Sequence, residues 1–399
     1  LAQVLGTPDT AQDLRINMLA LQMLGRIGHS RSAPVLVRAL FILGRRRPVA
    51  LQEVAREAIL QVRDLRAMAA ALVAAGRMQD PALLAMQQAD PDFDVRLIKE
   101  QVAITLGLIG PVSEEVTAYL TEELGHTAED DFDRTRSRGR VTFTPGLSAA
   151  YRRMWAAGAL ARMGHPPALP VIVRRLALRR AGGRYDLADP AIDLAEVPGY
   201  LDAAGDYLQP ARTDAVLLPF ALHGDEALRD RAGRRLSLQA PPEVADDLAG
   251  WATTAPECDP ELRGCVRRSF LSHYVPTIRA AAGCDTIPCW AGRLSSSPEH
   301  LRERAAHELA RRGVGDQGSA DQARAALLAA LPDSSTEVNQ AIVFALDRLS
   351  PQGCDAACLA RLEAVIEDLR VQHVHHATRR ALTGLRGVLR YRATAAAGH

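Results

Sequence analysis

Lysine, aromatic residues and an excess of either charge are all scarce in this chain. Lys99 is the single lysine among 48 basic residues, which are nearly balanced by 47 acidic residues for a net charge of +1. This balance argues against a strongly basic nucleic-acid surface or a polyanionic tail, although a local patch is compatible with it. Aromatic residues make up only 4% of the chain while hydrophobic residues make up 48%, so Leu, Ala, Val and Ile must build the core. Such a composition is typical of packed helices.

Long apolar runs are also missing. No stretch approaches the roughly 20 apolar residues that a helix needs to cross a bilayer. The longest candidates, such as Ala67–Gly76, are typical of a helix in a protein core. The chain begins at Leu1 without a basic or apolar leader, and this start gives no information on the compartment.

What the chain does contain is a repeated pattern. Residues 19–40, LALQMLGRIGHSRSAPVLVRAL, predict an amphipathic helix that ends at a glycine turn, followed by a second helix with proline near its start. The pattern returns at residues 104–120 and 159–176. A chain of 399 residues is too long for one compact core but suits an array in which each unit packs on its neighbours.

Two stretches interrupt this array. Residues 126–147 are polar and charged, with a short extended piece expected at 141–144, and residues 181–213 are rich in Gly, Pro and Asp. Insertions in repeat proteins usually form loops on one face, so we expect a local site near them. The predicted order is N-terminal repeats at 1–125, an inserted loop at 126–147, one repeat at 148–180, an inserted segment at 181–213, C-terminal repeats at 214–391 and a tail at 392–399.

The segments LGRIGHSRSAPVLVRAL, LGLIGPVSEEVTAYL and LARMGHPPALPVIVRRL resemble HEAT repeats, in particular the variety first noted in phycobilisome lyases. The resemblance implies an all-α fold, an alpha-alpha superhelix of antiparallel helix pairs whose second helices line a concave surface. It also implies binding more often than catalysis. We therefore expect a non-enzymatic scaffold or adaptor that mediates protein–protein interaction within a larger bacterial assembly, with no cofactor.

Enzymes on similar scaffolds define the alternatives. Bilin lyases share the motif, but nothing in this sequence marks a bilin pocket. Deoxyhypusine hydroxylase binds iron through several His-Glu dipeptides, and here only His307 and Glu308 form one. Alkylpurine DNA glycosylases need a basic channel and aromatic contacts, which near-neutral charge and three tryptophans do not obviously supply. A scaffold-borne lyase or modifying enzyme with its site at 181–212, and a nucleic-acid-binding HEAT protein, remain the alternatives.

A cluster of arginines is the candidate partner-binding site. The helix predicted over residues 167–180 is the second helix of its repeat, which lines the concave face if the HEAT resemblance holds. A positive patch on this face would receive an acidic partner segment or a phosphate, whereas the alternative is a set of paired surface arginines. The candidate residues are Arg174, Arg175, Arg179 and Arg180 on that helix, and Arg152 and Arg153 on the first helix of the same repeat.

The six cysteines fall as three close pairs in the C-terminal part of the chain. Three short-loop disulfides would indicate an oxidising compartment, the periplasm or the exterior, with the cytoplasm as the alternative. The first four could instead bind zinc, although their spacing is not that of zinc knuckles, or all six could be buried thiols. The pairs are Cys258 with Cys265, Cys284 with Cys289, and Cys354 with Cys358.

Two further clusters are not predicted to bind metal. His373 and His376 share a helical face, but no carboxylate or cysteine lies near them in the sequence. Asp130, Asp131 and Asp133 lack the glycine and glutamate spacing of an EF-hand loop. We expect both clusters to be solvated.

Overall fold

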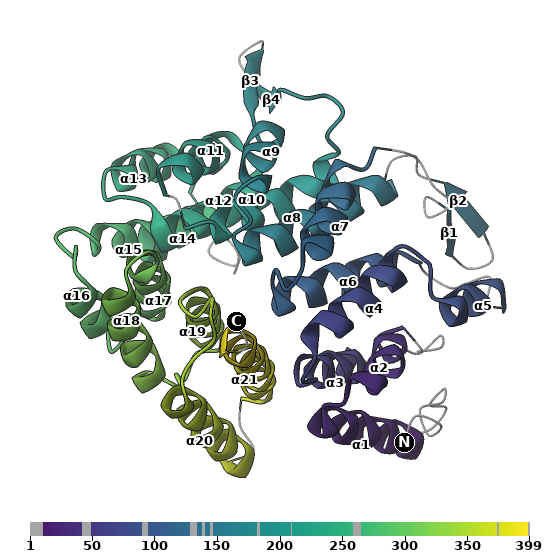
Figure 1. The fold of residues 1–399 in the computed structure, drawn as a ribbon. Helices are drawn as coiled ribbons and strands as arrows, with labels where there is room; N and C mark the ends of the chain where they lie inside the picture. The colour runs from purple at the N-terminus through teal and green to yellow at the C-terminus, as the bar shows by residue number, and fades with distance from the viewer. Residues whose placement is uncertain are drawn as a thin grey trace. The chain divides into compact units, whose positions relative to one another are not determined.

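A computed structural model describes residues 11–41, 49–89, 95–127, 134–137, 140–143, 147–181, 184–208, 210–257, 265–372 and 375–397. Over these residues the chain is helical apart from two short β-hairpins (Figure 1), so the predicted all-α class is confirmed. The chain divides into two compact units. Unit 1 comprises Leu1–Met163 and Ser350–His399, and unit 2 comprises Gly164–Leu349. Within the described ranges no helix is long and apolar enough to cross a membrane.

Unit 1 contains the first part of the predicted array and the two last helices of the chain. Helices α1, α3, α6 and α8 pack one against the next, and α2, α4 and α7 pack beside them. The elements are α1 (Ala11–Ile27), η1 (Ser30–Ser32), α2 (Ala33–Ala39), α3 (Val49–Leu60), α4 (Leu65–Gly76), α5 (Pro81–Ala89), α6 (Val95–Ile109), α7 (Glu114–Gly125), β1 (Arg134–Ser137), β2 (Arg140–Phe143), α8 (Leu147–Met163), α20 (Ala356–Gln372) and α21 (His376–Ala397).

The glycine turns of the repeated motif share one backbone conformation. Gly28, Gly110 and Gly164 directly follow α1, α6 and α8, and their φ angles are +64°, +87° and +67°. Side chains make this left-handed conformation costly, so glycine commonly ends a helix in this way. The three turns that the sequence pattern predicted are therefore equivalent in the structure.

A second feature of the motif fixes how its helices pack. An added Cβ at Gly25 in α1 would lie 2.7 Å from the Ala58 Cα in α3, and one at Gly107 in α6 would lie 3.1 Å from the Ala159 Cα in α8. Each glycine stands three residues before its turn glycine. The small residue thus lets α1 approach α3, and α6 approach α8, in the same way.

The C-terminal helix α21 closes unit 1 against its N-terminal helices. Gly387 packs against the backbone of Leu60, and Arg390 Nη2 donates a hydrogen bond of 2.9 Å to the carbonyl oxygen of Gln61. The helix continues to Ala397, so it extends into the segment 392–399 that the sequence analysis assigned to a tail. Apolar residues such as Leu382 and Leu389 are fully buried in this contact region.

Unit 2 is one continuous stretch of chain. Its elements are α9 (Ala168–Arg175), β3 (Leu178–Ala181), β4 (Arg184–Leu187), η3 (Leu194–Glu196), α10 (Val197–Asp206), α11 (Pro210–His223), α12 (Glu226–Gln239), α13 (Val244–Thr254), α14 (Val266–Ser269), η4 (Phe270–Tyr274), α15 (Val275–Arg279), α16 (Ile287–Arg293), α17 (Glu299–Gly313), α18 (Gln317–Ala329) and α19 (Thr336–Arg348).

Helix α17 is largely buried within unit 2, and it packs against α12, α16, α18 and α19. Its Arg304 is only 1% exposed. The guanidinium donates hydrogen bonds of 3.0 and 2.7 Å to the carbonyl oxygens of Ser237 and Ala240 at the end of α12. The terminal carbonyls of a helix lack partners within the helix and carry partial negative charge, so Arg304 satisfies them.

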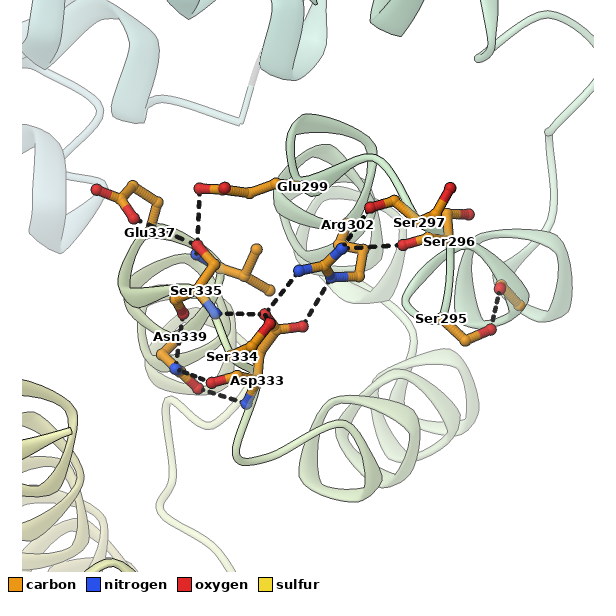
Figure 2. A network of polar contacts seen from close by, with 12 residues as sticks. Ser295, Ser296, Ser297, Glu299, Arg302, Asp333, Ser334, Ser335, Glu337 and Asn339 are labelled. Atoms are coloured by element: carbon orange, nitrogen blue, oxygen red, sulfur yellow. Dashed lines mark hydrogen bonds and ion pairs between the residues drawn. The ribbon is translucent and has the colours of Figure 1, made fainter. Parts of the chain in front are cut away.

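A polar network joins α17 to the turn before α19 (Figure 2). Arg302 makes a bidentate contact with the Asp333 carboxylate at 2.8 and 2.9 Å, and it also donates to the carbonyl oxygen of Ser297 at 2.9 Å. Asn339 donates hydrogen bonds of 2.7 Å to the carbonyl oxygens of Asp333 and Ser335. Side-chain bonds to backbone groups therefore hold two consecutive helical hairpins together.

The two predicted insertions are more regular than expected. Residues 181–213 contain β4, η3, α10 and the start of α11, and Tyr200 and Tyr207 are buried. The Gly and Pro content of this segment suggested a loop, but Pro198 stands in the first turn of α10, where proline is well tolerated. In the first insertion β1 pairs with β2 in antiparallel register, and β2 covers most of the predicted extended piece. The acidic residues Asp130, Asp131 and Asp133 lie outside the described residues.

Two of the three predicted disulfides are present. Cys284 is bonded to Cys289 with their Cα atoms 5.6 Å apart, and Cys354 to Cys358 with their Cα atoms 5.9 Å apart. The four-thiolate zinc site is therefore wrong, because two of its ligands are bonded to each other. Cys258 lies outside the described residues, so its pairing with Cys265 stays a prediction.

Both disulfides close the first turn of a helix. Thr286 is the N-cap of α16 and its side chain accepts a hydrogen bond from the backbone N–H of Cys289. Asp355 stands in the same relation to Cys358 before α20, with a distance of 2.8 Å. The cap turns the chain back over the helix start, and this brings the preceding cysteine to the first turn.

Candidate protein-binding surface

Arg152 and Arg153 on α8 do not form an exposed patch. Arg152 Nε lies 2.6 Å from Glu123 Oε2 in α7, and its Nη1 lies 2.8 Å from Nε2 of His126. Arg153 is 7% exposed and donates to the carbonyl oxygen of His126 at 2.8 Å. The prediction of a partner site at these two residues does not fit their burial, because their charges are used within unit 1.

The single lysine belongs to the same network. Lys99 Nζ on α6 donates a hydrogen bond of 2.8 Å to Glu123 Oε1, so one buried carboxylate is shared by Lys99 and Arg152. Burial alone would raise the pKa of Glu123, but the hydrogen bonds and charges of both cations hold it below its usual value. This network joins α6, α7 and α8. Lys99 is only 7% exposed, so its charge is not accessible to a partner.

The other four predicted arginines lie on two different elements of unit 2. Helix α9 ends at Arg175, so Arg179 and Arg180 lie on strand β3 instead of the predicted helix. Arg174 is exposed, whereas Arg175 donates a hydrogen bond to the hydroxyl of Tyr200 on α10. The four residues therefore do not share one helical face. The dipeptide Gly-Gly between the two strands is a hairpin signal that the sequence analysis overlooked.

The β3–β4 hairpin begins an exposed stack of side chains. Arg180 is the cross-strand partner of Tyr185, and its guanidinium carbon lies 5.9 Å from the centroid of the Tyr185 ring. The Tyr185 ring also stacks on the imidazole of His223 at the end of α11, with centroids 3.8 Å apart and an angle of 8° between the planes. The hairpin thus rests on a helix end through an Arg–Tyr–His stack.

A second pair continues this surface along the next hairpin. The guanidinium carbon of Arg229 on α12 lies 4.5 Å from the centroid of the Trp251 ring on α13, within the range of a cation–π contact. Burial and the positive charges of Arg180 and Arg229 lower the pKa of His223. We call Arg180, Tyr185, His223, Arg229 and Trp251 the Arg–aromatic surface.

Arg229 is partly exposed. Its Nε is closed to solvent and makes no hydrogen bond to any described residue. Burial lowers the pKa of Arg229, while the negative charges of Glu226 and Asp225 act in the opposite direction. The planar guanidinium is held over Trp251, so it would lose little conformational freedom on pairing with a carboxylate. Sequence reasoning missed Arg229, although its Leu-Arg dipeptide in the first turns of a helix recurs at Leu301 and Arg302.

The predicted enzymatic segment contains a polar chain that is structural. Tyr200 in α10 donates to the Glu196 carboxylate and accepts from Arg175, and burial raises the pKa of this tyrosine. Tyr200 is 0% exposed, so the chain of contacts joins α9 to α10 in the interior. Across the described ranges, no group of three or more His, Cys, Asp or Glu side chains has an arrangement that could hold a metal ion. His373 lies outside those ranges.

One interior carboxylate of unit 2 has no partner. Asp214 on α11 is 7% exposed, and neither of its oxygens makes a hydrogen bond. Burial raises its pKa to about 7, against the opposing effect of Arg304, while Glu308 reinforces the shift. A perturbed carboxyl group can mark a catalytic site when it faces a cleft. Here the burial of its side chain places it in the packed core of unit 2.

Comparison with known proteins gives no family. No family model and no curated protein sequence matches the chain. A crystal structure of an engineered protein is 14% identical over 98% of this chain and 97% of that protein, with a TM-score of 0.28. A second engineered protein is 12% identical over 61% of this chain and 91% of its own, with a TM-score of 0.22. Likenesses this weak support no argument about function.

Proposed function

We propose that this protein is a non-enzymatic helical-repeat scaffold that holds an acidic segment of another protein on the Arg–aromatic surface. The observation that carries the proposal is the partly exposed guanidinium of Arg229, whose central carbon lies 4.5 Å from the centroid of the Trp251 ring. The adjacent Arg180, Tyr185 and His223 extend the surface. Its functional groups are two cationic donors and flat rings, with no nucleophile next to a base.

The side-chain chemistry favours a carboxylate ligand on a protein. Arginine and aromatic residues are enriched at interface hot spots, where a planar group is anchored and the surrounding contacts exclude water. The rings also suit stacked nucleobases, which is how single-stranded nucleic acids are often bound. A nucleic-acid site, however, tracks the backbone with many basic residues, and this chain has a net charge of only +1.

The scaffold part of the proposal has separate support. The glycine turns after α1, α6 and α8 share a left-handed conformation, and the Gly25–Ala58 and Gly107–Ala159 contacts repeat one packing geometry. These regularities are consistent with a HEAT-type array. The disulfides Cys284–Cys289 and Cys354–Cys358 favour an oxidising compartment, so we place the assembly outside the cytoplasm.

The test is affinity capture of the protein from its own cells with two matched charge-reversal variants. Arg180→Glu with Arg229→Glu changes the Arg–aromatic surface, and Arg174→Glu with Arg179→Glu makes the same change in charge at exposed arginines outside it. We expect a stoichiometric partner that is retained by the wild-type protein and the second variant and lost by the first. Retention by the first variant would contradict the proposed site.

The nucleic-acid alternative has its own measurement. Binding of a fluorescent single-stranded oligonucleotide is followed while the salt concentration is raised. A steep fall in affinity with salt, abolished by Arg180→Glu with Arg229→Glu, would assign the surface to nucleic acid. We expect no such binding. The enzymatic alternative predicts that Tyr200→Phe abolishes an activity of the captured assembly without loss of the partner. We do not expect this result.

A further inference from the structure

Helix α1 presents an exposed apolar stripe. Four large apolar side chains of this helix are exposed, with fractions of 43% for Ile16, 58% for Leu19, 44% for Met23 and 52% for Ile27. Their spacing of three, four and four residues puts them on one face of the helix. Elsewhere in the described ranges, exposed large apolar side chains occur singly on their elements. They are Leu84, Ile104, Leu194, Leu271, Val314 and Val371.

The adjoining face of α1 is already used. Ala20, Leu21 and Leu24 are buried, and Gly25 brings the helix against Ala58 of α3. The buried residues and the exposed stripe lie side by side on the helix, so α1 has an apolar arc wider than its contact with α3 covers. A helix at the end of an array has a polar outer face, which this arc does not provide.

The charges beside the stripe indicate what covers it. Arg15 and Arg26 are both exposed, and helical geometry places them together on the flank next to Leu19. Within the described part of the chain, burial raises the pKa of Glu57 in α3, and the charge of Arg26 acts on this carboxyl group in the opposite direction. Helix α1 contains two arginines and a single acidic residue, Asp13, so a second copy of α1 would bring more arginines than carboxylates to this surface. Charge complementarity thus favours a partner with acidic residues beside its apolar face.

We propose that the face of α1 formed by Ile16, Leu19, Met23 and Ile27 is a docking surface for an amphipathic helix of another protein, with glutamate or aspartate along the flank that meets Arg15 and Arg26. Helix-in-groove and helix-on-helix recognition use this spacing of apolar anchors. The surface lies in unit 1 and is independent of the Arg–aromatic surface in unit 2.

The probes are two fluorescein-labelled helical peptides of 18 residues that carry leucine along one face. One has glutamate on both flanks of this face and the other has lysine at the same positions. Fluorescence anisotropy measures their binding to the full chain. We expect the acidic peptide to bind at least tenfold more tightly than the basic one. The double variant Arg15→Glu with Arg26→Glu should reverse that preference.

A second pair of variants tests the apolar stripe. Leu19→Ser with Met23→Ser should weaken binding of the acidic peptide at least tenfold, whereas Leu194→Ser with Val371→Ser removes two exposed apolar side chains elsewhere and should leave it unchanged. Circular dichroism verifies that both variants keep their helix content. Equal binding of the two peptides, or binding that survives the stripe substitutions, would overturn the proposal. A concentration-dependent dimer that only the stripe variant loses would assign the surface to a second copy instead.

Discussion

Two arginines at equivalent places in unit 2 have different surroundings. Arg302 on α17 and Arg229 on α12 each follow a leucine in the first turns of their helices. Arg302 reaches the carboxylate of Asp333 in the turn before α19, whereas Arg229 lies over Trp251 of α13. Arg302 therefore ties its helix to the turn beyond the next helix through an ion pair, whereas Arg229 contacts an aromatic ring on the helix that directly follows its own.

The largest expected effect tests this difference directly. Arg302→Ala removes a bidentate pair whose side chains are 12% and 10% exposed and leaves Asp333 without its partner. We expect unit 2 to lose about 3 kcal/mol of unfolding free energy in urea titration, because an unpaired buried charge is costly. Arg229→Ala should cost less than about 1 kcal/mol, since it removes a half-exposed cation–π contact. An equal loss in both variants would contradict the comparison.

Local sequence patterns predicted most helices because their signal is short in range. The pattern predicted at residues 104–120 covers the end of α6, its glycine turn and most of α7, and the turn glycines stand where the motif placed them. The candidate site was predicted less well. Arg152 looked like a surface residue because its partner Glu123 is 29 residues away in the chain. Contacts between distant segments leave no periodic pattern in the sequence, so periodicity could not reveal that burial.

Asp214 contrasts with the partly exposed Arg229 because it is a buried carboxylate whose oxygens accept no hydrogen bond from any described residue. Its pKa is raised to about 7, so the folded protein binds a proton that the unfolded chain releases above about pH 4. Stability attributable to this group is therefore highest in acid and falls as the pH rises from about 4 to about 7. Relative to wild type, the unfolding free energy of Asp214→Asn should be about 2 kcal/mol higher at pH 8 and unchanged at pH 4. This gain is smaller than the free energy that corresponds to the whole pKa shift.

The measurement is the urea midpoint at several pH values, with Asp186→Asn as the control at an exposed aspartate on β4. Arg304, Glu308 and Arg311 are the charged groups whose influence on Asp214 must stay unchanged in the variant. A gain that is the same at pH 4 and pH 8 would show that the substitution acts through packing and not through the proton.

The disulfides distinguish the two units. Cys284–Cys289 lies in unit 2 and Cys354–Cys358 in unit 1, and each closes a very short loop. Chain-entropy arguments give about 2 kcal/mol for loops of this size. Replacing one pair by serine should lower the protection from hydrogen exchange in its own unit. Loss of protection in the other unit to the same extent would show that the units unfold together.

The smallest effect concerns the turn glycines. Gly28→Ala places a Cβ in a left-handed conformation at φ +64° and within 3.2 Å of the Gln61 carbonyl oxygen. We expect a loss of about 1 kcal/mol. Gly158→Ala is the control, since it lies within helix α8 with no atom within 4 Å of the added Cβ, and it should stabilise by about 0.5 kcal/mol. A loss at Gly158 as large as at Gly28 would contradict this prediction.

The contact between α21 and α3 has a consequence for the order of folding. The bond from Arg390 to Gln61 joins residues 329 positions apart, whereas unit 2 is continuous in the chain. A chain emerging from a ribosome can complete unit 2 before its last helices are made, but the N-terminal helices must wait for α21. During synthesis the surface of α3 that receives Gly387 is thus exposed, and a chaperone or a second nascent chain has its best opportunity to bind there.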